Sequence, residues 1–302
     1  IGDCTDVMVA SSPSVASDDW SPSPQLSTVT VLSVGDELSD LAPVSFQGTA
    51  DTVYASPAAL YIASASWDEA GPRTDVHRLG LSGDGPAAYT GSGRIPGTLV
   101  DQFALSDRDG MLRAVTTTQA VQTEPMRGVE ATADIAVAPA SEARLTVLDT
   151  DGTLDEVASL GGMGVGEQVQ SVRFLDDIAY LVTFRQVDPL YAVDLSDPRA
   201  PRLLGELKIP GFSEYLHPIG DGLLLGVGRQ VDPSSGMDEG LKISLFDLAD
   251  PTRPVELDQI VLPGATSEVS NDHRAFLWDP NRDQAVIPAE LTGCDQSGRC
   301  TG

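Results

Sequence analysis

The chain contains very little lysine, histidine or cysteine. Its 302 residues include two lysines and three histidines, and 45 acidic residues outnumber 18 basic ones to give a formal net charge of −27. Such a surface repels nucleic acid and anionic lipid, which proteins bind through basic patches. No apolar run approaches the 18 residues of a membrane-spanning helix. We therefore expect no nucleic-acid partner, and membrane attachment only through an anchor missing from this chain.

The three cysteines favour an oxidising compartment. Cys294 and Cys300 lie close together in a polar loop, and we expect them to form a disulfide in a secreted or cell-surface anchored protein. Cys4 is left without an assigned partner. A zinc site needs four ligands and no histidine lies near the pair, so we expect no metal there and no cofactor.

A repeat organises the sequence. The pentapeptide Arg-Gln-Val-Asp-Pro begins at Arg185 and again at Arg229. Around each copy lie four short runs rich in valine, leucine, isoleucine and aromatic residues, separated by turns such as Ser196–Pro198 and Ala249–Pro251. This pattern is typical of strands joined by hairpins. Four strands in a unit of about 40–50 residues predict an all-β fold, a β-propeller built from four-stranded antiparallel blades.

The pattern predicts four complete blades and two half-blades. Thr28–Val34 and Val44–Gly48 are third and fourth strands without a first and second, whereas Arg274–Leu277 and Gln284–Ala289 are a first and second without the others. The halves either pair to close a five-bladed ring or belong to a larger propeller of which this chain is a fragment. The predicted organisation is an irregular N-terminal segment (1–27), the blades (28–291) and a truncated loop with the cysteine pair (292–302).

Several segments resemble a known family. Ser171–Pro218, Leu223–Pro251 and Asp272–Pro280 closely resemble the bacterial and archaeal secreted proteins with a C-terminal β-propeller domain, and Thr52–Ser64 and Arg94–Leu105 resemble them too. The resemblance implies export, often with an N-terminal anchor, and further blades on both sides. It favours the larger propeller over the five-bladed ring. It implies no particular activity.

One position of the predicted first strands differs from its apolar neighbours. It carries a different polar or aromatic residue in each blade, namely Tyr54, Gln102, Arg173, His217 and, in the fifth copy, His273. First strands are innermost in a propeller, so these side chains are predicted to line the central channel and to bind a ligand there. The alternative is a wet channel wall that tolerates any polar residue.

The loops after second strands form a second candidate site. Arg185, Asp188, Arg229 and Asp232 are predicted on one face of the propeller together with the insertion Gln119–Glu142. Irregular loops on one face of a repeat array often form its binding face. The arginines either present guanidinium groups to an anion or pair locally with the aspartates and brace the loops. Recurrence in the repeat favours the second interpretation.

Two further motifs are interpreted as structural. Asp149, Asp151 and Asp155 form a weak calcium candidate, but they align with the hairpin turns at Asp194–Pro198 and Asp247–Pro251, which favours a turn. His77 is predicted to lie on a third strand with its side chain in solvent.

Two classes of function remain. The favoured one is a non-catalytic binding or interaction scaffold outside the cytoplasm, with an unknown protein or small-molecule partner and no catalytic residues. The alternative is a hydrolase- or lactonase-like enzyme with its site at the mouth of the channel. An enzyme of this kind needs carboxylates or histidines that converge in space, and no local motif supplies such a pair.

Overall fold

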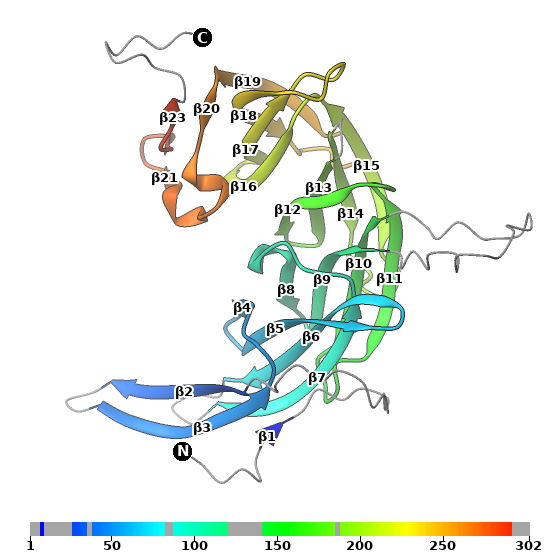
Figure 1. Ribbon diagram of the computed structural model, residues 1–302, viewed down its shortest axis with the longest axis vertical. Coiled ribbons are helices and arrows are strands. Elements are labelled where there is room, and N and C mark those ends of the chain that lie inside the picture. Colours follow the sequence, from blue (N-terminus) through cyan, green and yellow to red (C-terminus); the bar gives the residue numbers. More distant parts are fainter. Residues whose placement is uncertain are drawn as a thin grey trace, which may run out of the picture. The chain divides into compact units, whose positions relative to one another are not determined.

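The computed structural model describes residues 7–8, 26–34, 38–81, 87–119, 141–184 and 188–291 (Figure 1). These residues form strands and three single-turn 3₁₀ helices. The chain divides into two compact units, residues 1–140 with 144–160 and residues 141–143 with 161–302.

Two four-stranded sheets account for most of the first unit. In both, each strand pairs with its neighbour in sequence. The first sheet contains β4 (Thr52–Ala55), β5 (Ala59–Asp68), β6 (Gly71–Gly80) and β7 (Ala88–Pro96). The second contains β8 (Leu105–Arg108), β9 (Met111–Thr118), β10 (Glu142–Asp149) and β11 (Glu156–Met163). We call these sheets blades 1 and 2.

Two more sheets of the same kind form blades 3 and 4 in the second unit. Blade 3 contains β12 (Gln168–Leu175), β13 (Ile178–Phe184), β14 (Asp188–Asp194) and β15 (Arg202–Ile209). Blade 4 contains β16 (Phe212–Gly220), β17 (Leu223–Val231), β18 (Asp238–Asp247) and β19 (Val255–Pro263). The prediction of an all-β chain with four complete four-stranded blades is confirmed.

Each unit also contains incomplete sheets. In the first unit, β2 (Leu26–Val34) and β3 (Leu38–Gln47) form a hairpin, and β1 (Val7–Met8) pairs in parallel with β3. In the second, β21 (Leu277–Asp279) pairs with β22 (Gln284–Val286), and β20 (Ala265–Thr266) pairs with β23 (Glu290–Leu291). The segment 1–27, predicted to be irregular, therefore contributes β1 and the start of β2.

Two of the predicted first strands begin too early in the sequence, because their first residues form 3₁₀ turns. The segment Asp101–Leu105 forms the 3₁₀ turn η1 (Gln102–Ala104) before β8, and η3 (His273–Ala275) likewise precedes β21. The side chains of Asp101 and Asp272 explain both turns, because each accepts a hydrogen bond from the backbone N–H two residues later. An aspartate in this capping role favours a helical turn over an extended strand.

A recurring backbone hydrogen bond defines one end of every complete blade. The residue that follows the third strand donates its N–H to the carbonyl oxygen of the last residue in the turn between the first and second strands. The four pairs are Leu81–Ala58, Thr150–Gly110, Leu195–Asp177 and Leu248–Gly222. The two turns of each blade therefore lie at the same end, as the repeat predicts.

The cores lie between the faces of neighbouring sheets. In the first unit, Tyr61, Val76 and Ile95 of blade 1 pack against Leu112 and Leu148 of blade 2. In the second unit, residues of blade 3 such as Val182 and Leu190 pack against Leu216, Leu224 and Phe246 of blade 4. Alternation along each strand produces this arrangement, because successive side chains point to opposite faces.

Candidate functional site

A cluster of polar and aromatic side chains gathers on the inner strands of the second unit. Arg173 of β12 reaches β16, where its Nε donates to the carbonyl oxygen of Leu216 at 2.8 Å and its Nη2 donates to the same oxygen. The guanidinium carbon lies 5.4 Å from the centre of the Tyr215 ring. The guanidinium therefore connects blades 3 and 4 through a charged hydrogen bond and a cation–π contact.

His217 lies beside this pair and carries a neutral imidazole. Its Nδ1 is 3.0 Å from the Tyr215 hydroxyl, and its ring centre is 4.5 Å from that of Phe276. Burial, and then the positive charge of Arg173, lower the pKa of His217 below its usual value. His273 of η3 lies near the same tyrosine, with ring centres 6.5 Å apart. We call Arg173, Tyr215, His217, His273 and Phe276 the inner cluster.

The strand register shows which predicted positions are equivalent. Tyr54, Arg173 and His217 each lie opposite the third residue of the following strand, namely Tyr61, Tyr180 and Leu225. In blade 2 this place belongs to Ser106, which lies opposite Arg113. Gln102 and His273 occupy the 3₁₀ turns instead. Aligning Gln102 and His273 with Tyr54, Arg173 and His217 was wrong. Asp101 and Asp272 each begin a 3₁₀ turn, so the strand starts a few residues later than the sequence pattern indicates.

Tyr54 belongs to a bracing network in the first unit. Its hydroxyl accepts a hydrogen bond from the backbone N–H of Asp107 at 3.0 Å, and Ser56 donates to the Asp107 carboxylate at 2.8 Å. The Tyr61 hydroxyl accepts from Arg78 Nε at 3.1 Å. Burial raises the pKa of Tyr61, which keeps the phenol neutral. These contacts join blades 1 and 2 by their inner strands.

The expected bracing pair between Arg229 and Asp232 is wrong. Arg229 lies at the end of β17 and pairs with Asp238 of β18, with Nε and Oδ2 2.8 Å apart. The Asp232 carboxylate instead accepts hydrogen bonds from the backbone and side chains of Ser234 and Ser235, which lower its pKa to about 2. Asp188 begins β14. Arg185 and residues 120–140 of the predicted insertion lie outside the described residues.

The three aspartates considered for calcium form a turn. Asp149 accepts a hydrogen bond from the N–H of Asp151, and Asp155 accepts one from the Thr153 hydroxyl. Within the described residues, no group of three histidine, cysteine or acidic side chains is placed to hold a metal ion. Cys4, Cys294 and Cys300 are outside the described residues, so their pairing stays a prediction.

His77 is buried, and its prediction as a solvated residue is wrong. Its side chain has no exposed surface, its ring centre lies 4.5 Å from that of Phe46 in β3, and its Nδ1 is 3.0 Å from the Tyr89 hydroxyl. The β2–β3 hairpin covers the face of blade 1 on which His77 lies. Burial lowers the pKa of His77, opposed by the Asp75 charge and a hydrogen bond with the Gln47 backbone.

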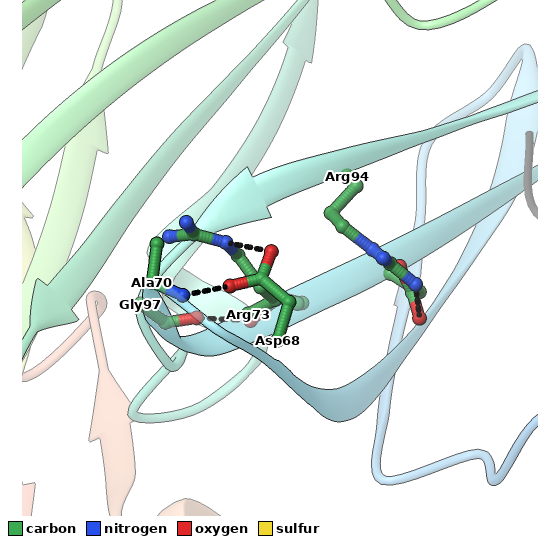
Figure 2. Close-up of polar contacts among 7 residues, drawn as sticks. Asp68, Ala70, Arg73, Arg94 and Gly97 are labelled. Atoms are coloured by element: carbon green, nitrogen blue, oxygen red, sulfur yellow. Dashed lines mark hydrogen bonds and ion pairs between the residues drawn. The ribbon is translucent and has the colours of Figure 1, made fainter. Parts of the chain in front are cut away.

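Sequence reasoning also missed a set of ion pairs on blade 1 (Figure 2). Asp68 accepts hydrogen bonds from Arg73 Nε at 2.7 Å and from the N–H of Ala70 at 2.9 Å, while Arg94 pairs with Asp75 across β6 and β7. Although burial opposes the shift, the hydrogen bond from Arg73 lowers the pKa of Asp68. The Asp68–Arg73 pair braces the β5–β6 hairpin, near whose tip Trp67 is exposed, and the Arg94–Asp75 pair joins β7 to β6. Cross-strand ion pairs follow from the register, which the sequence alone does not supply.

No helix in the described part of the chain is long and apolar enough to cross a membrane.

Comparisons with known proteins agree with this architecture. A family model described as a beta propeller domain matches residues 4–301. An uncharacterised protein of Methanocaldococcus jannaschii is 38% identical over 198 residues, which cover 66% of this chain and 28% of that protein. An uncharacterised protein of Archaeoglobus fulgidus is 37% identical over 203 residues, covering 67% and 28% of the two chains. The matched region is thus just over a quarter of each curated relative.

Two solved structures align with the chain at low TM-score and low sequence identity. The apocarotenoid oxygenase of Synechocystis, in a Glu150Asp mutant, aligns with a TM-score of 0.42 and 13% identity over 80% of this chain and 58% of that chain. The WD40 domain of Toxoplasma gondii coronin aligns with a TM-score of 0.28 and 11% identity over 90% and 72% of the two chains.

Proposed function

We propose that this chain, which belongs to the beta propeller domain family, is an extracytoplasmic binding scaffold whose inner cluster captures a small polar ligand. A propeller domain supports interaction in general, since its rigid blades hold loops and inner strands in fixed positions. The finer proposal concerns where the ligand binds and what holds it there.

The convergence of Arg173, His217 and His273 around Tyr215 carries the proposal. These side chains come from β12, β16 and η3, three elements that follow one another in the repeat. Polar groups that converge from separate elements on an apolar, aromatic background are typical of a small-molecule site. Hydrogen bonds and ring contacts hold Arg173 and Tyr215 in place, which supports a site whose side chains need little rearrangement on binding.

The neutral imidazole of His217 sets the chemistry that the site offers. Its Nδ1 faces the Tyr215 hydroxyl, so the ring orientation is fixed and Nε2 is the nitrogen left to meet a ligand. A neutral ring either donates or accepts a hydrogen bond, depending on its tautomer. With the positive charge of Arg173 close by, the cluster suits a ligand with hydroxyl or carboxylate oxygens.

A thermal-shift series tests the binding proposal. Acetate, inorganic phosphate and glucose serve as probes of anionic and neutral oxygen ligands. We expect saturable stabilisation of the full chain by at least one probe and its loss in His217→Ala, while the matched variant His77→Ala keeps the response. Equal responses in the wild type and His217→Ala would refute the site.

A second candidate function rests on the same imidazole. A histidine that is neutral at pH 7 can accept a proton from a nucleophile, as a hydrolase or lactonase requires. Hydrolysis of p-nitrophenyl acetate by the wild type, lost in His217→Ala, would favour this enzyme alternative over simple binding.

The proposal of an extracytoplasmic location is supported by the spacing of Cys294 and Cys300. A local cysteine pair is suited to an oxidising compartment. Its test is the redox state of the pair in protein secreted by an expression host.

A further inference from the structure

The β2–β3 hairpin, blue in Figure 1, is held on blade 1 by a small apolar core. Among the described residues, the buried members of this core are Phe46 of β3, Ile62 of β5, Leu79 of β6 and Ala87 just before β7. The core between blades 1 and 2 has ten buried members in the same part of the chain. A segment that buries few apolar side chains opens more readily than the rest of a domain. We therefore expect the hairpin to separate from blade 1 more easily than blades 1 and 2 separate from each other.

His77 lies within this contact and is fully buried. Its ring centre is 4.5 Å from that of Phe46, and its Nδ1 is 3.0 Å from the Tyr89 hydroxyl. The other nitrogen lies against the end of the hairpin, since a Cβ added to Gly48 would be 3.7 Å from Nε2. The hairpin and blade 1 together enclose the imidazole, which reaches water only when the hairpin moves away.

The charged groups on this side of blade 1 are already paired. On β6, the carboxylate of Asp75 pairs with Arg94 of β7. Near the tip of the β5–β6 hairpin, Asp68 pairs with Arg73. Within the described residues, an imidazolium at His77 would therefore share these carboxylates with arginines and have none of its own.

The other groups that face His77 do not supply a negative charge in acid. Tyr89 of β7 stays neutral, because burial raises the pKa of its hydroxyl. The described side chains of β2 and β3, residues 27–30 and 43–47, include no titratable group, and the residue opposite His77 on β5 is Ile62. A charge in such a contact is costly. Burial is accordingly the largest influence on the pKa of His77, and it lowers this pKa.

The chain that follows the hairpin has its own attachment to blade 1. The carbonyl oxygen of Thr49 accepts a hydrogen bond from the Ser64 hydroxyl, and the carboxylate of Asp51 accepts one from the N–H of Ala65 at 2.8 Å. Gly48, with a φ of 144°, separates this attachment from β3. Glycine permits backbone rotations that other residues resist, so the hairpin can pivot at Gly48 while β4 stays paired with β5.

We propose that the β2–β3 hairpin is a pH-sensitive flap that leaves blade 1 when His77 takes up a proton. At pH 7 the neutral imidazole packs against Phe46, and the flap covers Ile62 and Leu79. In the released state His77 is in water and binds a proton near its usual pKa of about 6.5. Each pH unit below this value therefore raises the ratio of released to docked flap by up to about tenfold, until the lowered pKa of the docked state is reached.

Amide hydrogen exchange of the full chain at pH 7 and pH 5 tests the flap. Each rate is divided by the rate of an unfolded peptide of the same sequence, which removes the direct effect of pH on exchange. Protection of residues 43–47 in β3 should fall at least about fivefold from pH 7 to pH 5, while β9 and β10 of blade 2 keep their protection. An equal fall in blade 2 would indicate global unfolding and overturn the proposal, as would protection of β3 that does not change.

His77→Phe separates protonation of this residue from other effects of acid. Phenylalanine keeps a ring against Phe46 but does not titrate, so β3 should be equally protected at pH 7 and pH 5. Tyr89→Phe is the matched control, because it alters the same contact and leaves His77 in place. Its fall in protection should persist. A fall in His77→Phe as large as that of the wild type would contradict the role of His77.

A second variant and a second readout cover the case in which His77→Phe does not fold. Glutamine in His77→Gln accepts a hydrogen bond from the Tyr89 hydroxyl without titrating, so its flap should be less protected than that of the wild type at pH 7 and no less protected at pH 5 than at pH 7. Release uncovers Ile62 and Leu79, so the fluorescence of an apolar dye should rise from pH 7 to pH 5 in the wild type and stay constant in either variant. Constant dye fluorescence in the wild type would overturn the proposal.

Discussion

The Tyr215 hydroxyl and Nδ1 of His217 lie 3.0 Å apart on the same face of β16. This contact fixes the orientation of the imidazole ring through Nδ1 and does not involve Nε2. Phe276 packs against the ring, and Arg173 crosses from β12 over the face of the tyrosine. A cluster of polar and aromatic side chains thus lies on strands that otherwise build a scaffold, because the inner position of the repeat carries a different side chain in each blade.

Arg173→Ala should destabilise the chain by about 1–2 kcal/mol, because the carbonyl oxygen of Leu216 would lose charged donors. Urea unfolding measures the loss, and Arg173→Lys should restore only part of it, since lysine lacks the paired donors of a guanidinium. Unchanged stability in Arg173→Ala would show that the residue does not brace β16.

His77→Leu should make stability less dependent on pH between 7 and 5. The folded state keeps His77 neutral, with its pKa lowered by burial, whereas the unfolded chain protonates this histidine near its usual pKa of about 6.5. Stability from this group is therefore present above the usual pKa of about 6.5 and is lost as the pH falls toward the lowered pKa of the folded state.

The free energy of unfolding changes with pH at a certain slope, and comparing this slope between the wild type and His77→Leu isolates the contribution of His77 from that of other titratable groups. Asp75 and Tyr89 remain in both proteins, and so does His217, whose lowered pKa acts in the same direction. Urea unfolding at pH 7 and pH 5 supplies the two slopes. Parallel slopes in the wild type and His77→Leu would contradict the burial of a neutral imidazole.

Gly93→Ala should destabilise the first unit by about 2–4 kcal/mol, the range of a severe steric change in a core. An added Cβ would lie 2.3 Å from the carbonyl oxygen of Leu154, which belongs to the turn before β11. Gly80→Ala is the control, since its Cβ would meet the Thr90 methyl at 3.0 Å and the carbonyl oxygen of Ala88 at an ordinary 3.8 Å. Thermal unfolding compares the two, and equal melting temperatures would contradict the close approach of β7 to this turn.

Cys294 and Cys300 should be oxidised in protein secreted by an expression host. Mass spectrometry of the unreduced, alkylated chain should find neither residue modified, whereas reduced protein should take up the reagent at both. Full alkylation before reduction would contradict the disulfide and weaken the case for export.

The sequence predicted the four blades well because the repeat is local. Each blade needs four apolar runs separated by short turns. A hairpin turn such as Asp221-Gly222 is recognisable from the sequence, because Asp-Gly is a favoured sequence for turns in which both residues have a positive φ, as these two do. The pentapeptide that begins at Arg185 and again at Arg229 allows two blades to be aligned, and this alignment predicted where the strands around it begin and end.

The positions of the candidate site residues were predicted less well, because strand register and helix capping decide them. Arg173 and His217 were aligned correctly, because the first strands of blades 3 and 4 match in sequence without gaps. Gln102 and His273 were misaligned, since Asp101 and Asp272 cap helical turns whose effect appears only in three dimensions. Arg229 pairs with Asp238 rather than Asp232, because the partner across a hairpin depends on loop length and not on distance in sequence.

Histidine NMR tests the central claim most directly, because the chain contains only three histidines. His217 and His273 belong to the inner cluster. His77 lies in the first unit, outside the cluster, and its signal therefore serves as an internal control. Titration of histidine-labelled full chain with the probe that gives the largest thermal shift should move the imidazole signals of His217 and His273 saturably and leave those of His77 in place. Signals from all three that do not move, or that move equally, would contradict a ligand site at the inner cluster.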